Sequence, residues 1–142
     1  MSTYVPEISA GARPVSIRRE VFGLLALVDL SNPARRLLDV LLSLYNEETG
    51  VAEISQREMA AALGTAVPAV NRAVQQLRET GLAWQIEDGH YQLHPLLTGG
   101  AVASPAVSVP EIKAVQPAAF TEQRRERYTA QIANLGQLAA SA

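Results

Sequence analysis

Residues 54–95, ISQREMAAALGTAVPAVNRAVQQLRETGLAWQIEDGHYQLHP, contain two helix signals separated by a tight turn and followed by a change of hydrophobic period. The first helix begins after Ser55. Ser followed three positions later by Glu58 is a capping box, in which each side chain accepts a hydrogen bond from the backbone N–H of the other residue. Gly64 ends this helix, because glycine adopts the left-handed conformation of a helix C-terminus without steric cost.

A second helix is predicted after a two-residue turn, over about residues 67–79. Its apolar positions follow the i, i+3, i+4, i+7 spacing of one helix face; they are Val70, Ala73, Val74 and Leu77. Gly81 closes it. The usual Ser or Thr cap of such a helix falls at Ala66, so the first N–H groups have no side-chain partner unless Thr65 provides one.

The hydrophobic period then changes from helical to alternating. The alternating apolar residues are Leu82, Trp84 and Ile86 before the sequence Glu87-Asp88-Gly89, and Tyr91 and Leu93 after it. Asp-Gly between two alternating runs is a strong signal for a β-hairpin.

A broad apolar stripe precedes this stretch and predicts a core helix from Pro33 to Tyr45, with Asn32 as its N-cap. The short segment 51–54 can pair as a strand. Helix, short strand, helix, tight turn, helix and hairpin is the order of a winged helix-turn-helix domain. The predicted class is therefore α+β, mainly helical, with a further C-terminal helix beyond a linker.

Four regions are predicted along the chain. Residues 1–14 are a flexible lead, and residues 15–98 form the winged helix-turn-helix domain. Within it, residues 15–30 allow both strand and helix, and we expect an extended start followed by a short helix. Residues 99–118, rich in Gly, Ala, Pro and Val, are an extended linker. Residues 119–142 form an amphipathic helix, capped by Thr121, that must pack on its own domain or on a second copy.

Residues 54–95 resemble the winged-helix domains of bacterial regulators of the MarR and GntR type, and most of all the RepL-like proteins of plasmid replication and maintenance. Those proteins pair a capping-box helix ending in Leu-Gly with a helix ending in Gly-Leu or Gly-Phe, as Leu63-Gly64 and Gly81-Leu82 do here. Their wing closes on an aromatic, an aliphatic and an Asn/His-Pro, which here are Tyr91, Leu93 and His94-Pro95. The resemblance covers residues 33–98 and implies DNA binding.

The wing tip departs from the DNA-binding pattern. Glu87 and Asp88 are acidic where such wings often carry Arg or Lys, so the wing either makes no phosphate contact or points away. Residues 34–98 hold five arginines against eight acidic residues, a net charge of −3 in a chain whose net charge is −2. A protein that binds DNA through general phosphate attraction has a basic excess. Any DNA binding must therefore depend on a few placed arginines, on dimerisation or on the flanks.

The base contacts are predicted on helix 67–79, because the second helix of the motif lies in the major groove. They are Pro68, Ala69, Asn71, Arg72, Gln75 and Gln76. Arg reads guanine, and Asn or Gln reads adenine, through paired hydrogen bonds. The predicted phosphate contacts are Arg57, Thr65, Arg35 and Arg36. The alternative for the polar residues of helix 67–79 is an ordinary solvated helix face, and for Arg35 and Arg36 it is a solvent-facing helix start.

Other classes of function find little support in the sequence. The chain has no cysteine and two histidines, His90 and His94, and it shows no phosphate loop and no set of nucleophile, base and orienting residue. We therefore expect no enzyme, no metal site and no cofactor. Its most apolar stretch, residues 21–28, is far shorter than the ~20 residues of a membrane span, and the N-terminus has no signal-peptide pattern. We expect a cytoplasmic protein.

Two functions remain open. The first is sequence-specific binding of double-stranded DNA by helix 67–79, as a transcriptional regulator or as a plasmid or phage replication or partition factor, in a homodimer formed through residues 119–142. The second is a protein–protein adaptor that docks through its acidic face and binds no DNA.

Overall fold

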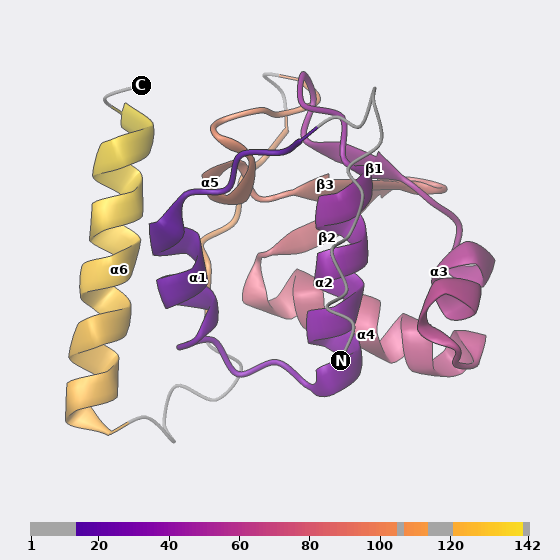
Figure 1. The fold of residues 1–142 in the computed structure, drawn as a ribbon, viewed down its shortest axis with the longest axis horizontal. Coiled ribbons are helices and arrows are strands. Elements are labelled where there is room, and N and C mark those ends of the chain that lie inside the picture. Colours follow the sequence, from indigo (N-terminus) through magenta and orange to yellow (C-terminus); the bar gives the residue numbers. More distant parts are fainter. Residues whose placement is uncertain (1–13, 105–106, 114–120, 141–142) are drawn as a thin grey trace, which may run out of the picture.

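The computed structural model describes residues 14–104, 107–113 and 121–140, with the side chains of the last helix described as far as Asn134. The elements are α1 (Arg19–Leu25), α2 (Asn32–Leu44), β1 (Val51–Glu53), α3 (Gln56–Leu63), α4 (Val67–Thr80), β2 (Ala83–Glu87), β3 (His90–Leu93), α5 (Pro95–Thr98) and α6 (Glu122–Ala140) (Figure 1). This order confirms the predicted α+β, mainly helical, winged helix-turn-helix fold. Apart from Pro14, the predicted flexible lead lies outside the described residues.

The central helix α2 carries the core of the domain. Its buried residues are Ala34, Leu37, Leu38, Leu41 and Leu42, and the helix packs on both α3 and α4. The predicted cap at Asn32 is wrong by one residue: Ser31 is the N-cap, and its Oγ accepts a hydrogen bond from the Ala34 amide at 3.3 Å. Ser and Asn are equally good caps, so their adjacency left the start of the helix ambiguous.

The two helices of the motif begin and end as the sequence predicts. Ser55 Oγ accepts from the Glu58 amide at 3.1 Å, and Glu58 Oε1 accepts from the Ser55 amide at 3.3 Å, which completes the capping box of α3. Ala66 is the N-cap of α4 and provides no side-chain bond. Gly64 and Gly81 end the two helices with φ of 65° and 78°.

The small sheet is antiparallel, in the order β1-β3-β2. Tyr91 on the central strand pairs with Ala52 on β1 and with Gln85 on β2, which confirms both the predicted strand and the predicted hairpin. Next to Tyr91, Gln92 is fully buried, with Nε2 donating to the Gly50 carbonyl at 3.2 Å and Oε1 accepting from the Ala103 amide at 2.9 Å. This side chain joins the turn before β1 to the chain that follows α5.

The flanking segments pack on the winged helix. Residues 14–18 have no helix or strand and lead into the short helix α1. This is the extended start followed by a short helix that the sequence predicts for residues 15–30. Helix α6 lies beside α1 (Figure 1), where Arg124 Nη2 donates to Asp29 Oδ1 at 2.7 Å. Tyr128 donates from its hydroxyl to the carbonyl of Ile112 at 2.7 Å, and Ile112 is buried against the core. The C-terminal helix therefore packs on its own chain.

The described parts of the predicted linker contain neither helix nor strand. They lie against the domain, since the Lys113 amide donates to the carbonyl of Thr80 at 2.8 Å. Residues 105–106 and 114–120 of the predicted linker are outside the described residues. None of the helices in the described part of the chain has the length and apolar character needed to cross a bilayer.

Candidate nucleic-acid interface

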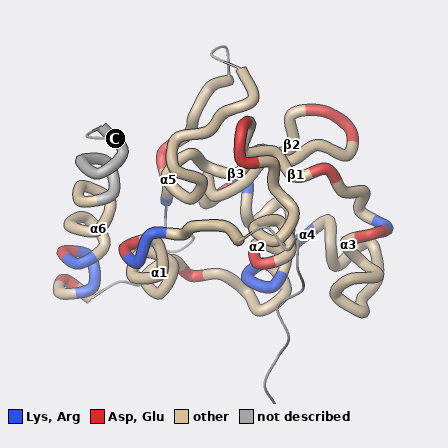
Figure 2. The backbone as a smooth tube through the Cα atoms, turned by 45° about the horizontal axis from the view of Figure 1, so that its top comes forward, with Lys and Arg blue, Asp and Glu red and all other residues tan. Residues whose placement is uncertain are grey.

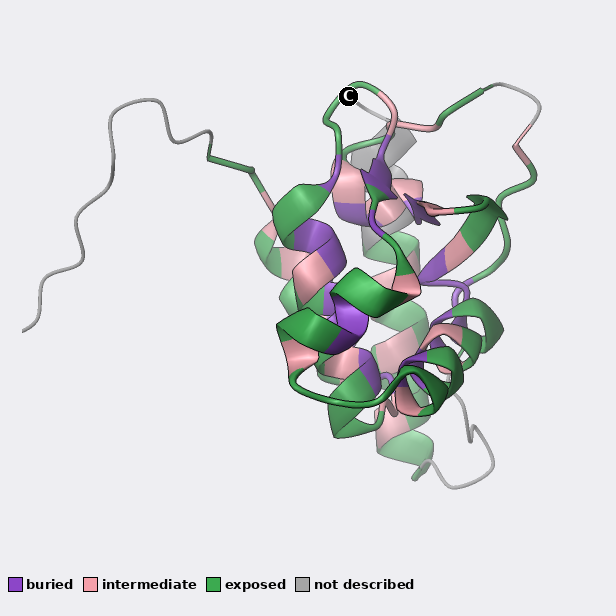
Figure 3. Ribbon diagram, turned by 90° about the vertical axis from the view of Figure 1, so that its right-hand side faces the viewer, coloured by how far each residue is buried: buried purple, intermediate pink, exposed green. Residues whose placement is uncertain are grey.

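One side of α4 faces the core and the other faces solvent. Val70, Ala73 and Leu77 are buried at the helical spacing that the sequence predicted. In Figure 3, which views the molecule from the end formed by α3 and the start of α4, the outer surfaces of these helices are exposed. The exposed residues of α4 are Val67, Pro68, Asn71, Arg72, Gln75, Arg78 and Glu79. Except for Val67, Pro68 and Glu79, each carries a side chain that can donate hydrogen bonds.

The structure separates the six predicted base contacts into two groups. Pro68, Asn71, Arg72 and Gln75 lie together on the exposed face. Ala69 and Gln76 are half-buried, and Gln76 Oε1 accepts a hydrogen bond from the Ser31 amide at 2.7 Å. Gln76 thus ties α4 to the start of α2, and it would have to break this bond before it could contact a base.

A cleft of about 380 Å³ runs between α4 and the wing, the hairpin formed by β2 and β3. It is lined by Gln56, Asn71, Val74, Gln75, Arg78, Gln85, Ile86, Glu87 and Asp88. The polar face of α4 therefore continues into the wing. Gln56, Arg78 and Gln85 belong to this surface and were missed by the sequence analysis. The signal for Arg78 was available, because it follows Gln75 by three residues and Asn71 by seven, and so shares their helix face.

The predicted phosphate contacts lie in two places. Arg57 is exposed on the first turn of α3, and Thr65 is exposed in the turn that leads to α4. Arg35 and Arg36 lie on the first turns of α2; Arg36 is exposed, whereas Arg35 is half-buried, with Nε 3.6 Å from Asp39 Oδ1. Figure 2 shows these basic positions at the starts of α2 and α3.

The wing contributes negative charge to the cleft. Glu87 and Asp88 are exposed and line it together with residues of α4, so the acidic tip borders the cleft beside α4. His90 lies behind the tip, with Nδ1 3.0 Å from the Asp88 carbonyl and Nε2 3.5 Å from Glu53 Oε1. The carbonyl of Asp88 raises the pKa of His90, and the charges of Glu87 and Glu53 add to this effect. Protonation of this ring partly offsets the acidic charge of the wing.

The second histidine, His94, is buried, and both of its ring nitrogens contact the backbone. His94 caps α5, where Nδ1 accepts from the Leu96 amide at 3.1 Å, and its Nε2 lies 3.0 Å from the Pro110 carbonyl. Burial lowers the pKa of His94, against the opposing effect of that carbonyl. Within the described residues, no three His, Asp or Glu side chains are grouped so that they could hold a metal ion.

Comparison with known proteins gives one match. Residues 35–93 match the family model of the Crp-like helix-turn-helix domain. Neither the search of curated proteins nor the search of solved structures gives a significant match. The matched residues run from the first turn of α2 to the end of β3, which is the whole winged-helix core. The match supports a helix-turn-helix DNA-binding protein, and it does not confirm the more specific resemblance to MarR, GntR or RepL-like proteins.

Proposed function

We propose that the protein binds double-stranded DNA sequence-specifically, with α4 in the major groove and the wing beside it. The exposed row of Asn71, Arg72 and Gln75 carries this proposal, because it presents base-reading side chains on the helix that enters the groove in this fold. Arg72 can donate two hydrogen bonds to guanine, and Asn71 and Gln75 can each pair with adenine. Arg78 extends the same row toward the wing.

The phosphate contacts of this proposal are Arg57 on the first turn of α3, Thr65 in the turn between α3 and α4, and Arg36 at the start of α2. The two arginines among them, Arg36 and Arg57, lie in residues 34–98, a region whose net charge is −3. Non-specific affinity should consequently be low, and most of the free energy of binding must come from contacts to bases.

Two copies on a symmetric site would supply the affinity that one copy lacks. We propose a homodimer. Tyr128 and Ile132 of α6 pack against the core of their own chain, so a dimer formed through residues 119–142 would use other faces of that helix. Whether the protein regulates transcription or acts in replication or partition depends on where its binding site lies.

A second candidate function is a protein–protein adaptor. The observation that favours it is the acidic wing tip: Glu87 and Asp88 border the very cleft that DNA would approach. A basic partner surface would fit this cleft, whereas phosphates would be repelled by it. The two functions differ in one measurable respect, because the adaptor binds no duplex.

The test is selection from a random duplex library with the full chain at ~150 mM salt, a condition that suppresses non-specific phosphate binding. We expect an enriched palindrome with half-sites about one helical turn apart. Arg72→Ala should weaken binding to that duplex by about 10- to 100-fold, the loss expected for one paired guanine contact.

The matched control is Arg19→Ala, which removes an exposed arginine at the start of α1, outside the proposed DNA contacts and outside residues 119–142. It should leave the affinity unchanged. Equal losses in the two variants would mean that Arg72 acts only through net charge. No enrichment by a folded protein would contradict DNA binding and favour the adaptor.

A further inference from the structure

A cavity of about 360 Å³ lies where three segments meet. The segments are the extended chain before α1, the turn after α2 and the helix α5, which contribute Pro14, Ser16 and Arg18, then Tyr45 and Glu47, then Leu96, Leu97, Thr98 and Gly99. This cavity shares no residue with the cleft between α4 and the wing. Its volume is in the range of sites that bind small molecules.

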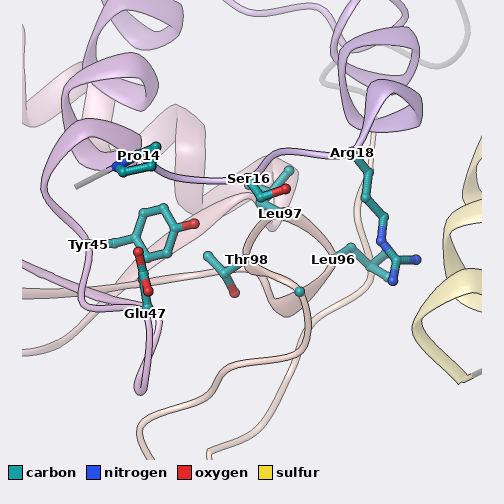
Figure 4. A pocket seen from close by; sticks show the side chains of 9 residues that line it. Pro14, Ser16, Arg18, Tyr45, Glu47, Leu96, Leu97 and Thr98 are labelled. Carbon is teal, nitrogen blue, oxygen red and sulfur yellow. The ribbon is translucent and has the colours of Figure 1, made fainter. Parts of the chain in front are cut away.

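Apolar and polar side chains line the cavity in similar measure, and hydroxyl groups are among them. Tyr45 follows the last residue of α2 in an extended conformation, and the residue is only 8% exposed. Figure 4 shows the Tyr45 hydroxyl pointing into the space between Ser16 and Thr98. Burial raises the pKa of Tyr45, and the charge of Glu47 adds to this. The phenol therefore remains a hydrogen-bond donor at neutral pH.

Two opposite charges line the cavity without neutralising each other: Arg18, which is half-buried, and Glu47, which is exposed. Arg18 and Glu47 lie at opposite ends in Figure 4, and no salt bridge joins them to each other or to any other residue in the described part of the chain. Arg18 is half-buried at the N-cap of α1, where a cation is disfavoured by the helix dipole. Its position is therefore not explained by stabilisation of α1.

We propose that this cavity binds a small linear zwitterion of the ω-amino acid class, with its carboxylate on Arg18 and its ammonium group on Glu47. Arg forms paired hydrogen bonds with a carboxylate, and a carboxylate such as Glu47 accepts from an ammonium group. The hydroxyls of Ser16 and Tyr45 provide further polar contacts along the ligand. Leu96, Leu97 and Pro14 pack against its methylene groups. A ligand with only one charge would leave one end of the cavity without a partner.

The experiment is a titration of the full chain with a series of ω-amino acids of increasing length: glycine, β-alanine, 4-aminobutyrate, 5-aminopentanoate and 6-aminohexanoate. Calorimetry measures the affinity, and amide chemical shifts locate the site. We expect saturable binding that is tightest at one chain length, with shifts centred on residues 16–18, 45–47 and 96–99. Hexanoate and hexylammonium, which each carry one of the two charges, should bind at least about tenfold more weakly.

Two pairs of variants test the assigned ends. Arg18→Gln and Glu47→Gln should each weaken the preferred ligand by at least about tenfold. Their matched controls are Arg19→Gln and Glu48→Gln, which change the exposed neighbouring residues outside the cavity and should leave the affinity unaltered. Thermal unfolding of each variant checks that it is folded.

Three results would overturn the proposal. They are no saturable binding of any member of the series, binding of hexanoate as tight as that of the preferred ligand, or a loss of affinity in the control variants as large as in Arg18→Gln and Glu47→Gln. The titration contains no DNA, so its outcome is independent of the proposed DNA binding.

Discussion

The two helices of the motif, α3 and α4, are held in place by different means. Helix α3 begins with the two hydrogen bonds of the Ser55–Glu58 box, whereas α4 begins at Ala66 with no side-chain bond. Both helices end at a left-handed glycine. Gly64, at the end of α3, is surrounded by open space, and Gly81, at the end of α4, lies against the backbone of Glu111. The start of α3 is thus fixed by its own capping box, and the end of α4 by the chain that packs on it.

The largest effect is expected at the C-terminal end of α4. Gly81→Ala forces a methyl group onto a φ of 78° and onto the carbonyl oxygen of Glu111. The left-handed conformation costs about 1–2 kcal/mol for a non-glycine residue, and forced overpacking adds about 1–3 kcal/mol. We expect the free energy of unfolding to fall by about 3 kcal/mol in urea denaturation.

The matched substitution at the end of α3 should cost less. Gly64→Ala has a similar φ of 65°, but no atom lies within 4 Å of the added methyl group. Only the conformational cost of about 1–2 kcal/mol remains. The same denaturation series measures it. If the two alanine variants lost equal stability, the chain around Glu111 would not be packed on Gly81 in solution, and the contrast between the two helix ends would disappear.

The features of α3 and α4 that the sequence predicted correctly are local ones. The capping box, the two terminal glycines and the buried spacing of Val70, Ala73 and Leu77 each depend on residues within one helix length of each other. The contact of Glu111 with Gly81 spans thirty positions along the chain and has no periodic signal. It was missed for that reason, and segment 99–118 was interpreted from composition alone as an extended linker.

The candidate interface shows the same limit. The helical pattern placed Asn71, Arg72 and Gln75 on the exposed face, where the structure has them. It could not show that the Gln76 side chain is bonded to Ser31, because that bond depends on how α2 crosses α4. Nor could it show that the acidic wing tip borders α4, since the sequence does not give the direction in which a hairpin folds back.

The start of α3 provides the next comparison. Ser55→Ala removes the oxygen that accepts from the Glu58 amide and leaves that donor without its side-chain partner. Loss of an N-terminal serine cap costs about 1 kcal/mol. We expect urea denaturation to show a fall of that size, with the slope of the transition unchanged. A loss near zero would show that tertiary contacts, and not the box, hold the start of α3.

The smallest effect is expected at the start of α4, for a reason that lies in its own first turn. Pro68 has no N–H, and the Ala69 amide already donates to the Ala66 carbonyl at 3.0 Å, so few donors there lack a partner. A serine at position 66 could bond only the Ala69 amide, in competition with that carbonyl. Ala66→Ser should therefore raise the free energy of unfolding by about 0.5 kcal/mol, less than Ser55→Ala removes. A gain of 1 kcal/mol or more would mean that the start of α4 is frayed in solution. The stability of the helix would then depend even more on the contacts at Gly81 than the structure indicates.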